Sequence, residues 1–236
     1  MKQQMKTIGL IGGMSWESSK VYYELINRRT HELLGGSHSS KSIMVTVDFS
    51  EIEKLSFQND WVGIGKIMVD AAQTLEKAGA DIVILCTNTI HIVSDSIENN
   101  ISIPFLHIAD TTGEAIQNTG VDKVGLLGTQ FTMEKDFYKG YLSERYNLDV
   151  IIPDDEDRKV IHDIIYNELV KGQFTETSKE KCKTIISNLV KKGAEGVIMG
   201  CTELPILVNE SDVTVPLFDT GKIHAFNAVN WAVGNE

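Results

Sequence analysis

The chain has 236 residues, enough for one large domain or for two domains of about 100 to 120 residues each. Hydrophobic residues make up 42% and charged residues 23%, a balance that excludes disordered, collagen-like and coiled-coil proteins. Asp and Glu number 33 against 22 Lys and Arg, which gives a net charge of −11. Because the chain is acidic and has no basic run, we expect no nucleic-acid partner.

The apolar stretches are short. None approaches the roughly 18 residues of a membrane-spanning helix, and the N-terminal apolar run is too short for a signal peptide. Three cysteines are an odd and low number, which is typical of reduced thiols rather than of a disulfide framework. We therefore expect a cytoplasmic protein that has no membrane partner.

Apolar runs alternate with amphipathic stretches along the chain. In chain order, we expect strands at 7–11, 43–47, 81–85, 123–127, 148–152, 196–199 and 215–218. The first half contains expected helices at 16–34 and 60–78, each followed by glycine. Strands that alternate with helices predict a mainly parallel sheet, whose ligands bind at the carboxyl ends of the strands.

The sequence also repeats itself at spacings of 112 to 116 residues. IGLIG at 8–12 is matched by VGLLG at 124–128, GAD at 79–81 by GAE at 193–195, CT at 86–87 by CT at 201–202, and PF at 104–105 by PL at 216–217. Four matches in the same order predict two homologous halves. We therefore expect an α/β fold of two pseudo-symmetric domains, each a mainly parallel sheet flanked by helices, with the active site in the cleft between them.

The domain boundaries follow from the repeat. We expect a first domain at 1–103 plus 208–236 and a second domain at 104–207. In this interpretation the last strand and the last helix return to the first domain.

The repeated Cys-Thr dipeptides are the strongest functional signal. Cys86-Thr87 follows the strand at 81–85 and opens a helix expected from Thr89 to Asn99, and Cys201-Thr202 follows the strand at 196–199. A helix N-terminus favours thiolate and can lower a cysteine pKa from about 8.5 toward 7. One cysteine at a strand end is explained by packing as a small hydrophobe. Two at equivalent points of a duplicated fold indicate a function.

Two thiols that face one ligand from opposite sides can invert a stereocentre. One thiolate removes a proton from a carbon atom, and the other thiol delivers a proton to the opposite face. A hydrolase needs only one nucleophile, and the cysteines of a redox pair usually lie close together in sequence. The duplication therefore indicates a racemase or an epimerase.

The segments IGLIGGMSWES, ILCTNT and GCTELPIL, together with the repeat, resemble the aspartate/glutamate racemase family of pyridoxal-independent amino-acid racemases. The resemblance covers the whole chain and is strongest to the aspartate racemase and broad-specificity branch. Glutamate racemase is less similar: it has an aspartate near Gly12-Gly13-Met14, and a histidine where this chain has Glu203. Family members are two-domain α/β enzymes, commonly dimers, which use two cysteines and neither a metal nor a cofactor. The resemblance thus implies a homodimer without a cofactor.

The resemblance also implies roles for individual residues. Cys86 and Cys201 would be the two acid/base residues. The residues that would bind the amino-acid substrate are Met14, Thr87, Asn88, Thr89, Thr129, Thr202, Glu203 and Lys171. Threonine and asparagine are also ordinary N-cap residues, which leaves a purely structural role open for them. Glu203 could orient Cys201, bind the substrate ammonium or complement a helix N-terminus.

The group that would bind the substrate side chain is less clear. An acidic substrate needs a cation, and family members that bind acidic substrates use an arginine and a lysine. The arginines all fall in helical stretches, at Arg28, Arg29, Arg145 and Arg158. Lys54 and Lys171 are the best candidates, which leaves broad specificity open. The histidines have no metal-ligand spacing, and His91 is expected to pack or to contact solvent.

These observations predict a cofactor-independent amino-acid racemase with aspartate or glutamate as the leading substrate. One alternative is a sister isomerase on the same scaffold, such as a maleate isomerase or a hydantoin racemase. The other alternative is an amino-acid-binding protein that has no turnover.

Overall fold

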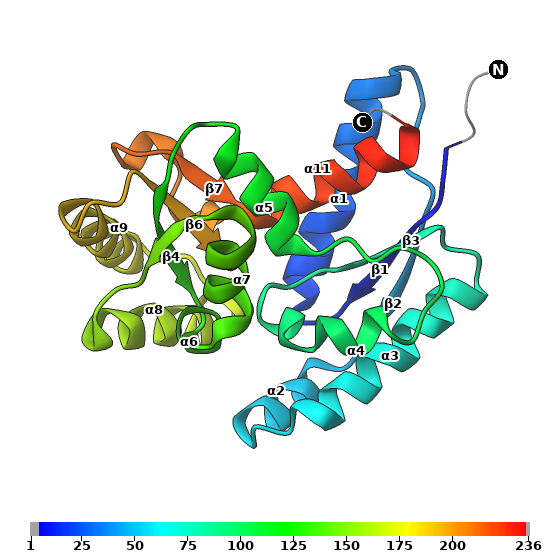
Figure 1. Cartoon of the computed structure of the whole chain (residues 1–236), viewed down its shortest axis with the longest axis horizontal. Coiled ribbons are helices and arrows are strands. Elements are labelled where there is room, and N and C mark those ends of the chain that lie inside the picture. The colour runs from blue at the N-terminus through cyan, green and yellow to red at the C-terminus, as the bar shows by residue number, and fades with distance from the viewer. Residues whose placement is uncertain (1–4, 235–236) are drawn as a thin grey trace. The chain divides into compact units, whose positions relative to one another are not determined.

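Two parallel sheets organise the chain, one in each of two units (Figure 1). The computed structural model describes residues 5–234. The first unit comprises the chain up to Ile108 and again from His224, and the second unit is Ala109–Ile223. The expected α/β fold, with two parallel sheets flanked by helices, is confirmed.

The first sheet has the strand order β2 (Ser42–Thr46), β1 (Ile8–Gly12), β3 (Ile82–Leu85), and all its strands are parallel. A parallel bridge from Val83 to Phe105 adds a short fourth position beside β3. The helical segments that begin in this unit are α1 (Trp16–Leu34), α2 (Phe49–Phe57), α3 (Trp61–Lys77), η1 (Thr89–Val93), α4 (Ser94–Glu98) and α5 (Ile108–Gln117).

Alternation along β1 divides the core of this unit into two layers. Ile8 and Leu10 pack with residues of α1 and of α11 (Thr220–Val233), whereas Ile11 packs with residues of α3. The central strands β1 and β3 are buried along their whole length, as expected of a parallel sheet covered on both faces. Figure 1 shows α1 and α11 on one face of this sheet and α3 on the other.

The second sheet has the strand order β5 (Asp149–Ile151), β4 (Lys123–Gly128), β6 (Gly196–Gly200), β7 (Leu217–Asp219), again all parallel. Its helical segments are α6 (Gln130–Glu134), α7 (Asp136–Tyr146), α8 (Asp155–Asn167), η2 (Leu169–Lys171), α9 (Glu176–Lys191), α10 (Leu204–Leu207) and η3 (Glu210–Asp212). Helix α11 begins directly after β7.

The same contacts recur in both units at the repeated sequence motifs. Gly79 and Gly193 follow α3 and α9 with φ of +92° and +97°, which glycine adopts without a steric cost. Two residues later, the carboxylate of Asp81 accepts a hydrogen bond from the N–H of Thr7 at 2.6 Å. Glu195 accepts the equivalent bond in the second unit, from the N–H of Lys123 at 3.3 Å.

The fourth strand position is also shared. The N–H of Val83 donates to the carbonyl of Pro104, and the N–H of Val197 donates to that of Pro216, at 2.9 Å in both units. The Pro-Phe and Pro-Leu dipeptides therefore mark the same point of two sheets that are built alike.

One expectation about the end of the chain is wrong. We expected the last strand to return to the first domain, but β7 pairs with β6 in the second sheet. The reason is the repeat itself, because Pro216-Leu217 takes in its own sheet the place that Pro104-Phe105 takes in the first. Of the last two elements, only the part of α11 from His224 onward belongs to the first unit. The observed units change at 108/109 and 223/224, later in the chain than the expected ranges 1–103 plus 208–236 and 104–207.

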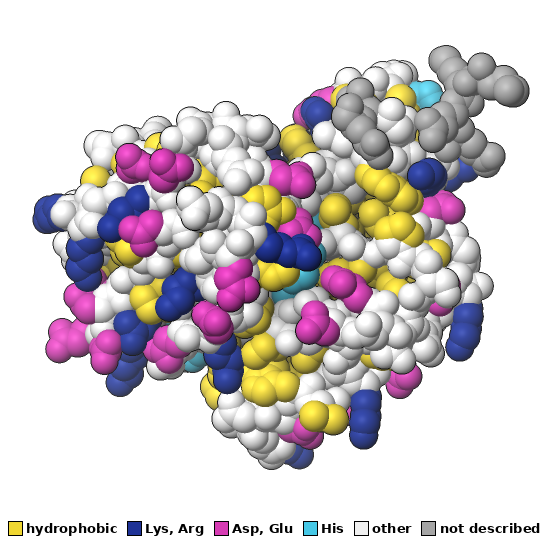
Figure 2. Space-filling view, viewed as in Figure 1, with side chains coloured by type: hydrophobic (Ala, Val, Ile, Leu, Met, Phe, Trp, Pro, Cys, Tyr) yellow, Lys and Arg dark blue, Asp and Glu magenta, His cyan; other side chains and the backbone are white. Residues whose placement is uncertain are grey.

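Charge and hydropathy of the surface fit the composition. Figure 2 shows Asp and Glu side chains interspersed with Lys and Arg across the visible face. Within residues 5–234, no helix is both long enough and apolar enough to cross a membrane.

Three histidines lie buried together in the first unit. The ring of His91 lies 4.8 Å from that of His107 and 5.8 Å from that of His224, measured between ring centroids. None of the three is more than 4% exposed. Across the described part of the chain, no group of His, Cys, Asp and Glu is arranged to hold a metal ion.

The hydrogen bonds of His224 fix the position of one ring proton. Its Nε2 lies 2.9 Å from the carbonyl oxygen of Leu106, which can only accept a hydrogen bond, so Nε2 carries a proton. Its Nδ1 forms a hydrogen bond with the hydroxyl of Tyr22 at 2.8 Å. Burial lowers the pKa of His224 to about 3, with a further contribution from His107.

His91 is also neutral. Its Nδ1 donates to the carbonyl of Thr87 at 2.7 Å, and its Nε2 accepts from the N–H of Ile108 at 3.2 Å. Burial lowers the pKa of His91 well below its ordinary value, and the neighbouring imidazoles lower it further. The histidine cluster (His91, His107 and His224) thus contains two rings that resist protonation.

Acidification should destabilise the protein through these rings. In the unfolded chain each histidine binds a proton near its ordinary pKa of about 6.5, whereas the folded protein does so only at much lower pH. Unfolding therefore takes up protons, and the free energy of unfolding should fall by about 1.4 kcal/mol per pH unit per histidine as the pH drops below about 6.5. Urea unfolding measured at several pH values should give a less steep fall for His224→Gln than for the wild type. Equal slopes would contradict this account.

Gly9 packs so closely against its neighbours that a side chain at this position should destabilise the protein. A Cβ at Gly9 would lie 2.9 Å from the Cβ of Ala80 and 3.1 Å from the carbonyl oxygen of Ile82. Neither atom can rotate away, so Gly9→Ala should cost about 1–3 kcal/mol of stability. Gly125→Ala is the matched control, because its nearest atom is the mobile Cδ1 of Leu189, at 2.8 Å. Thermal unfolding should show the larger loss for Gly9→Ala, and the reverse order would refute the argument.

Candidate functional site

The two predicted thiols lie at the same point of the two sheets. Cys86 directly follows β3 and Cys201 directly follows β6. In each unit this strand pairs with the strand that carries the first repeated motif, β1 or β4. Both cysteines are buried, with exposed fractions of 0% and 8%. Each unit therefore carries one thiol at the carboxyl edge of its sheet, which is where ligands of parallel sheets bind.

The backbone around Cys86 is held on every side. The N–H of Cys86 donates to the carbonyl of Ile11 at 2.9 Å, and the N–H of Thr87 donates to that of Leu85 at 2.8 Å. The hydroxyl of Ser18 donates to the carbonyl of Cys86 at 2.7 Å. Ser18 lies in the first turn of α1, so the start of this helix is tied to the end of β3.

The other predicted residues of the first unit gather at the same edge. Asn88 and Thr89 continue the turn after Cys86 and are 3% and 8% exposed. Met14 lies two residues beyond β1, which is the direct neighbour of β3, and it is buried. Met14, Thr87, Asn88 and Thr89 thus come from two adjacent strand ends. We call this set with Cys86 the first half-site.

The second half-site consists of Cys201, Thr202, Glu203 and Thr129. The thiol of Cys201 donates to Oε2 of Glu203 at 3.1 Å, and the hydroxyl of Thr202 donates to the same oxygen at 2.8 Å. Glu203 is only 3% exposed. Thr129 follows β4, the neighbour of β6, and it caps α6 by accepting from the N–H of Thr132 at 3.2 Å. The capping role that threonine left open from sequence is therefore observed at Thr129.

The two candidate lysines lie outside the segments that make up the half-sites. Lys171 lies in η2, between α8 and α9, and is exposed. Lys54 is exposed in the last turn of α2. As expected from the sequence, the arginines lie in helices, and each pairs with an acid: Arg28 with Glu24, Arg29 with Glu32, Arg145 with Asp110 and Arg158 with Glu134.

The expected thiolate is not supported. Burial raises the pKa of the Cys86 thiol far above its ordinary value. Burial and the carboxylate of Glu203 raise the pKa of Cys201 as well. Cys86 is followed by the 3₁₀ segment η1, which runs on into α4, and Cys201 by the four-residue helix α10; neither N-terminus outweighs the loss of water. Burial thus favours the thiol over the thiolate form of both cysteines in this structure.

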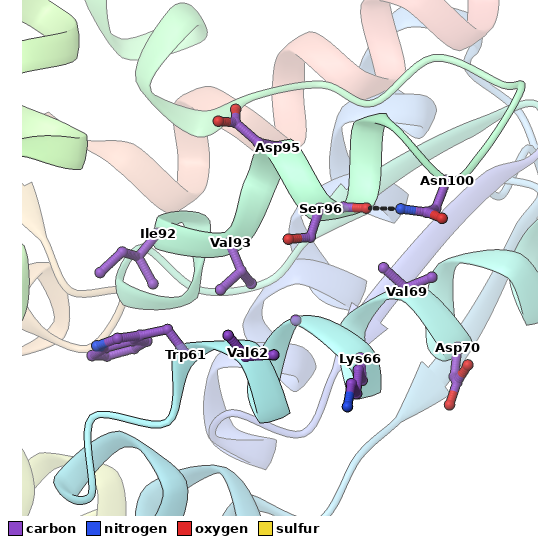
Figure 3. A pocket seen from close by; sticks show the side chains of 11 residues that line it. Trp61, Val62, Lys66, Val69, Asp70, Ile92, Val93, Asp95, Ser96 and Asn100 are labelled. Carbon is purple, nitrogen blue, oxygen red and sulfur yellow. Dashed lines mark hydrogen bonds between the residues drawn. The ribbon is translucent and has the colours of Figure 1, made fainter.

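A cavity elsewhere in the first unit contains none of the predicted residues. It has a volume of about 540 Å³ and lies between α3 and the segment formed by η1 and α4 (Figure 3). Trp61 and Val62 line it from α3, and Ile92 and Val93 line it from η1. The segment η1, which contributes Ile92 and Val93 to this cavity, also carries Thr89 of the first half-site.

Two residues that contact the first half-site were not among the predicted ligands. Ser18 is separated from Cys86 by 68 positions, and the sequence contains no signal for this contact. His91 was expected only to pack or to contact solvent, yet it binds the Thr87 carbonyl. Its position four residues after Thr87, on the predicted helix, was the only available indication.

The chain is similar over most of its length to known proteins of one family. The model of the Asp/Glu/hydantoin racemase family matches residues 11–228. The crystal structure of a Yersinia pestis protein named as a candidate Asp/Glu racemase is 48% identical, covers 97% of this chain and 99% of its own, and superposes with a TM-score of 0.90. An aspartate racemase homologue from Pyrococcus horikoshii is 37% identical with the same coverage and a TM-score of 0.84.

A curated relative extends this likeness. The broad specificity amino-acid racemase RacX of Bacillus subtilis is 22% identical over 94% of this chain and 96% of its own length. Racemases are isomerases, so the expectation of an isomerase is confirmed at the level of the family. On the family match and on these relatives, the chain belongs to the Asp/Glu/hydantoin racemase family.

Proposed function

We propose that the protein is a cofactor-independent amino-acid racemase in which Cys86 and Cys201 exchange the Cα proton of one substrate. The observation that carries the proposal is the equivalent placement of the two thiols at the carboxyl ends of β3 and β6. A fold that needed only one nucleophile would have no reason to keep a buried cysteine at the same point of both sheets.

The proton steps begin at Cys201. Its thiol already donates to Glu203, so this carboxylate can take the thiol proton. The Cys201 thiolate then removes the Cα proton from one face of the substrate, and the thiol of Cys86 delivers its own proton to the opposite face. The reaction leaves a thiolate at Cys86 and a thiol at Cys201. In the reverse direction Cys86 is the base and Cys201 is the acid.

Burial serves this chemistry even though it disfavours the thiolate. A thiol with a raised pKa gives a stronger base once its proton is gone, and the Cα–H of an amino acid is a very weak acid. Removing water from the thiolate therefore reduces the difference between the pKa of the thiol and the pKa of the Cα–H group. The substrate ammonium group would supply the positive charge that offsets the thiolate.

The polar residues of the two half-sites are the proposed substrate ligands. Thr87, Asn88, Thr89 and the backbone near Met14 would bind the α-carboxylate and ammonium groups from the first half-site. Thr129 and Thr202 would do so from the second half-site. All of them lie at the carboxyl edges of the sheets, where backbone N–H groups are available for anions.

Aspartate and glutamate are the leading substrates, with Lys171 as the proposed cation for the second carboxylate. Every arginine is engaged in a helix by an acid, so a bidentate arginine ligand is not part of this proposal. Substrates other than acidic amino acids remain within the proposal for the same reason. A homodimer stays a prediction from the family resemblance, and a cytoplasmic location stays a prediction from the low number of cysteines.

The first test is exchange of the Cα proton in deuterium oxide, followed by proton NMR with single L- and D-amino acids. Aspartate, glutamate, one basic and one neutral amino acid form the panel. Loss of the Cα–H signal and the appearance of both enantiomers on chiral analysis would establish racemisation and name the substrate. Double-bond isomerisation need not give exchange at Cα, and tight binding without exchange would indicate a binding protein.

Replacing either thiol should abolish racemisation. Cys86→Ala and Cys201→Ala should each lower the rate by about 10²–10⁴-fold or more, because each removes one of two acid/base groups. The remaining thiol should still exchange the Cα proton of a single enantiomer. Cys182→Ala is the matched control, since Cys182 is equally buried but lies in α9. Full racemisation by either half-site variant would overturn the two-thiol mechanism.

Replacing Glu203 distinguishes between two roles of its carboxylate, as the acceptor of the Cys201 proton or as a ligand of the substrate ammonium group. If Glu203 takes the thiol proton, Glu203→Gln should lower kcat by about 10²-fold and move the pH–rate profile to higher pH. The value of kcat/KM should fall equally for both enantiomers, because the equilibrium constant of racemisation is one. A rise in KM with an unchanged kcat would instead place Glu203 on the substrate ammonium group.

A further inference from the structure

Side chains, as well as backbone groups, hold the turn that carries Cys86. The carbonyl of Cys86 accepts from the hydroxyl of Ser18 at 2.7 Å, and the next carbonyl, that of Thr87, accepts from Nδ1 of His91 at 2.7 Å. In the second unit the carbonyl of Cys201 accepts from the backbone N–H of Leu204 at 3.1 Å. The repeat alone does not explain the histidine, because at the Cys86-to-Cys201 spacing its counterpart is Ile206, which is exposed.

Only one form of His91 fits its surroundings. The Thr87 carbonyl requires a proton on Nδ1, and the N–H of Ile108 requires a lone pair on Nε2. The ring thus joins the turn after Cys86 to the first residue of α5. It is 1% exposed and packs against His107, His224 and Phe105, at 4.8, 5.8 and 5.6 Å between ring centroids.

The ring is itself held by a second layer. His224 binds the carbonyl of Leu106, two residues before the N–H that His91 accepts, and Tyr22 binds His224. Tyr22 lies one helical turn after Ser18 on α1. The same helix therefore supports the Cys86 turn directly through Ser18 and indirectly through Tyr22 and the histidine cluster.

We infer that His91 is a positioning residue for Cys86, acting through its Nδ1–H bond to the Thr87 carbonyl. The inference rests on the proposed role of Cys86 in racemisation. His91 exchanges no proton with the substrate. It fixes the turn from which the thiol projects, and a displacement of about 1 Å at a reacting group can cost about 10²-fold in rate.

Two amide variants each keep a different one of the two hydrogen bonds of His91. The side-chain amide of His91→Asn lies where Nδ1 lay and keeps the donor to Thr87. The longer side chain of His91→Gln reaches the position of Nε2 and keeps the acceptor for Ile108 but loses the Thr87 bond. Both variants remove the aromatic ring, so they should lose a similar amount of packing.

The expected result is a difference between these two variants in kcat. His91→Asn should stay within about tenfold of the wild type, and His91→Gln should lose about 10²-fold in kcat with little change in KM. Tyr22→Phe is the control for the cluster, since it removes only the hydroxyl that binds His224 and leaves the Thr87 bond in place. Because Tyr22 acts on the turn only indirectly, the kcat of Tyr22→Phe should stay closer to the wild type than that of His91→Gln. Equal losses in both His91 variants, or a greater loss in His91→Asn, would overturn the inference.

A second readout does not depend on racemisation. In a Cys182→Ala, Cys201→Ala background, Cys86 is the single cysteine, and its alkylation rate reports how firmly the turn is held. This rate should rise in His91→Gln and stay near the parent value in His91→Asn. Should the wild type show no racemisation, the proposed function would fail, while the alkylation rates would still decide the role of His91. Identical alkylation rates in all three proteins would refute that role.

Discussion

The burial of one thiol at the carboxyl edge of each parallel sheet is the constraint on which the rest of the structure depends. Helices cover these strands on both faces, so the residue that directly follows the strand is buried from solvent. Both cysteines occupy this position. Loss of water raises the pKa of each thiol. Under the proposed mechanism, the neighbouring groups must therefore accept the thiol proton and hold the backbone of the turn, rather than only stabilise an anion. This explains why Glu203 lies against Cys201 and why two side chains fasten the turn at Cys86.

The sheets and the paired thiols could be predicted because local sequence determines them. Gly79 and Gly193 end helices through their own backbone freedom, and the acidic residue two positions later, Asp81 or Glu195, recurs at the same spacing, so the repeat reveals both motifs before any of their tertiary contacts are known. The last strand was misplaced although the evidence was present. Pro216-Leu217 repeats Pro104-Phe105, and applying the repeat consistently would have kept this strand in the second sheet.

The contacts that tune the site could not be predicted in this way. Ser18 meets the Cys86 carbonyl only because α1 packs across the end of β3, and no spacing along the chain encodes that crossing. The predicted lowering of the thiol pKa values was wrong for a physical reason. The sequence indicates a helix N-terminus after each cysteine, but it does not show how deeply the thiol is buried or how short the following helical segment is. His91 looked like a packing residue, and it does pack. Its function as a hydrogen-bond bridge depends on the Ile108 N–H, which reaches Nε2 through tertiary structure alone.

The two half-sites lie at equivalent strand ends but have different supporting groups. Cys201 has a buried carboxylate within hydrogen-bond distance, whereas the turn at Cys86 is held by a neutral imidazole. Under the proposed mechanism this asymmetry carries no thermodynamic penalty, since enantiomers have equal free energy and the ratio of kcat/KM in the two directions is fixed at one. The duplicated fold must preserve the placement of both thiols, but each half can prepare its thiol by a different route. In the second half-site the carboxylate of Glu203 accepts the proton of Cys201. In the first half-site the neutral ring of His91 fixes the position of the turn that carries Cys86.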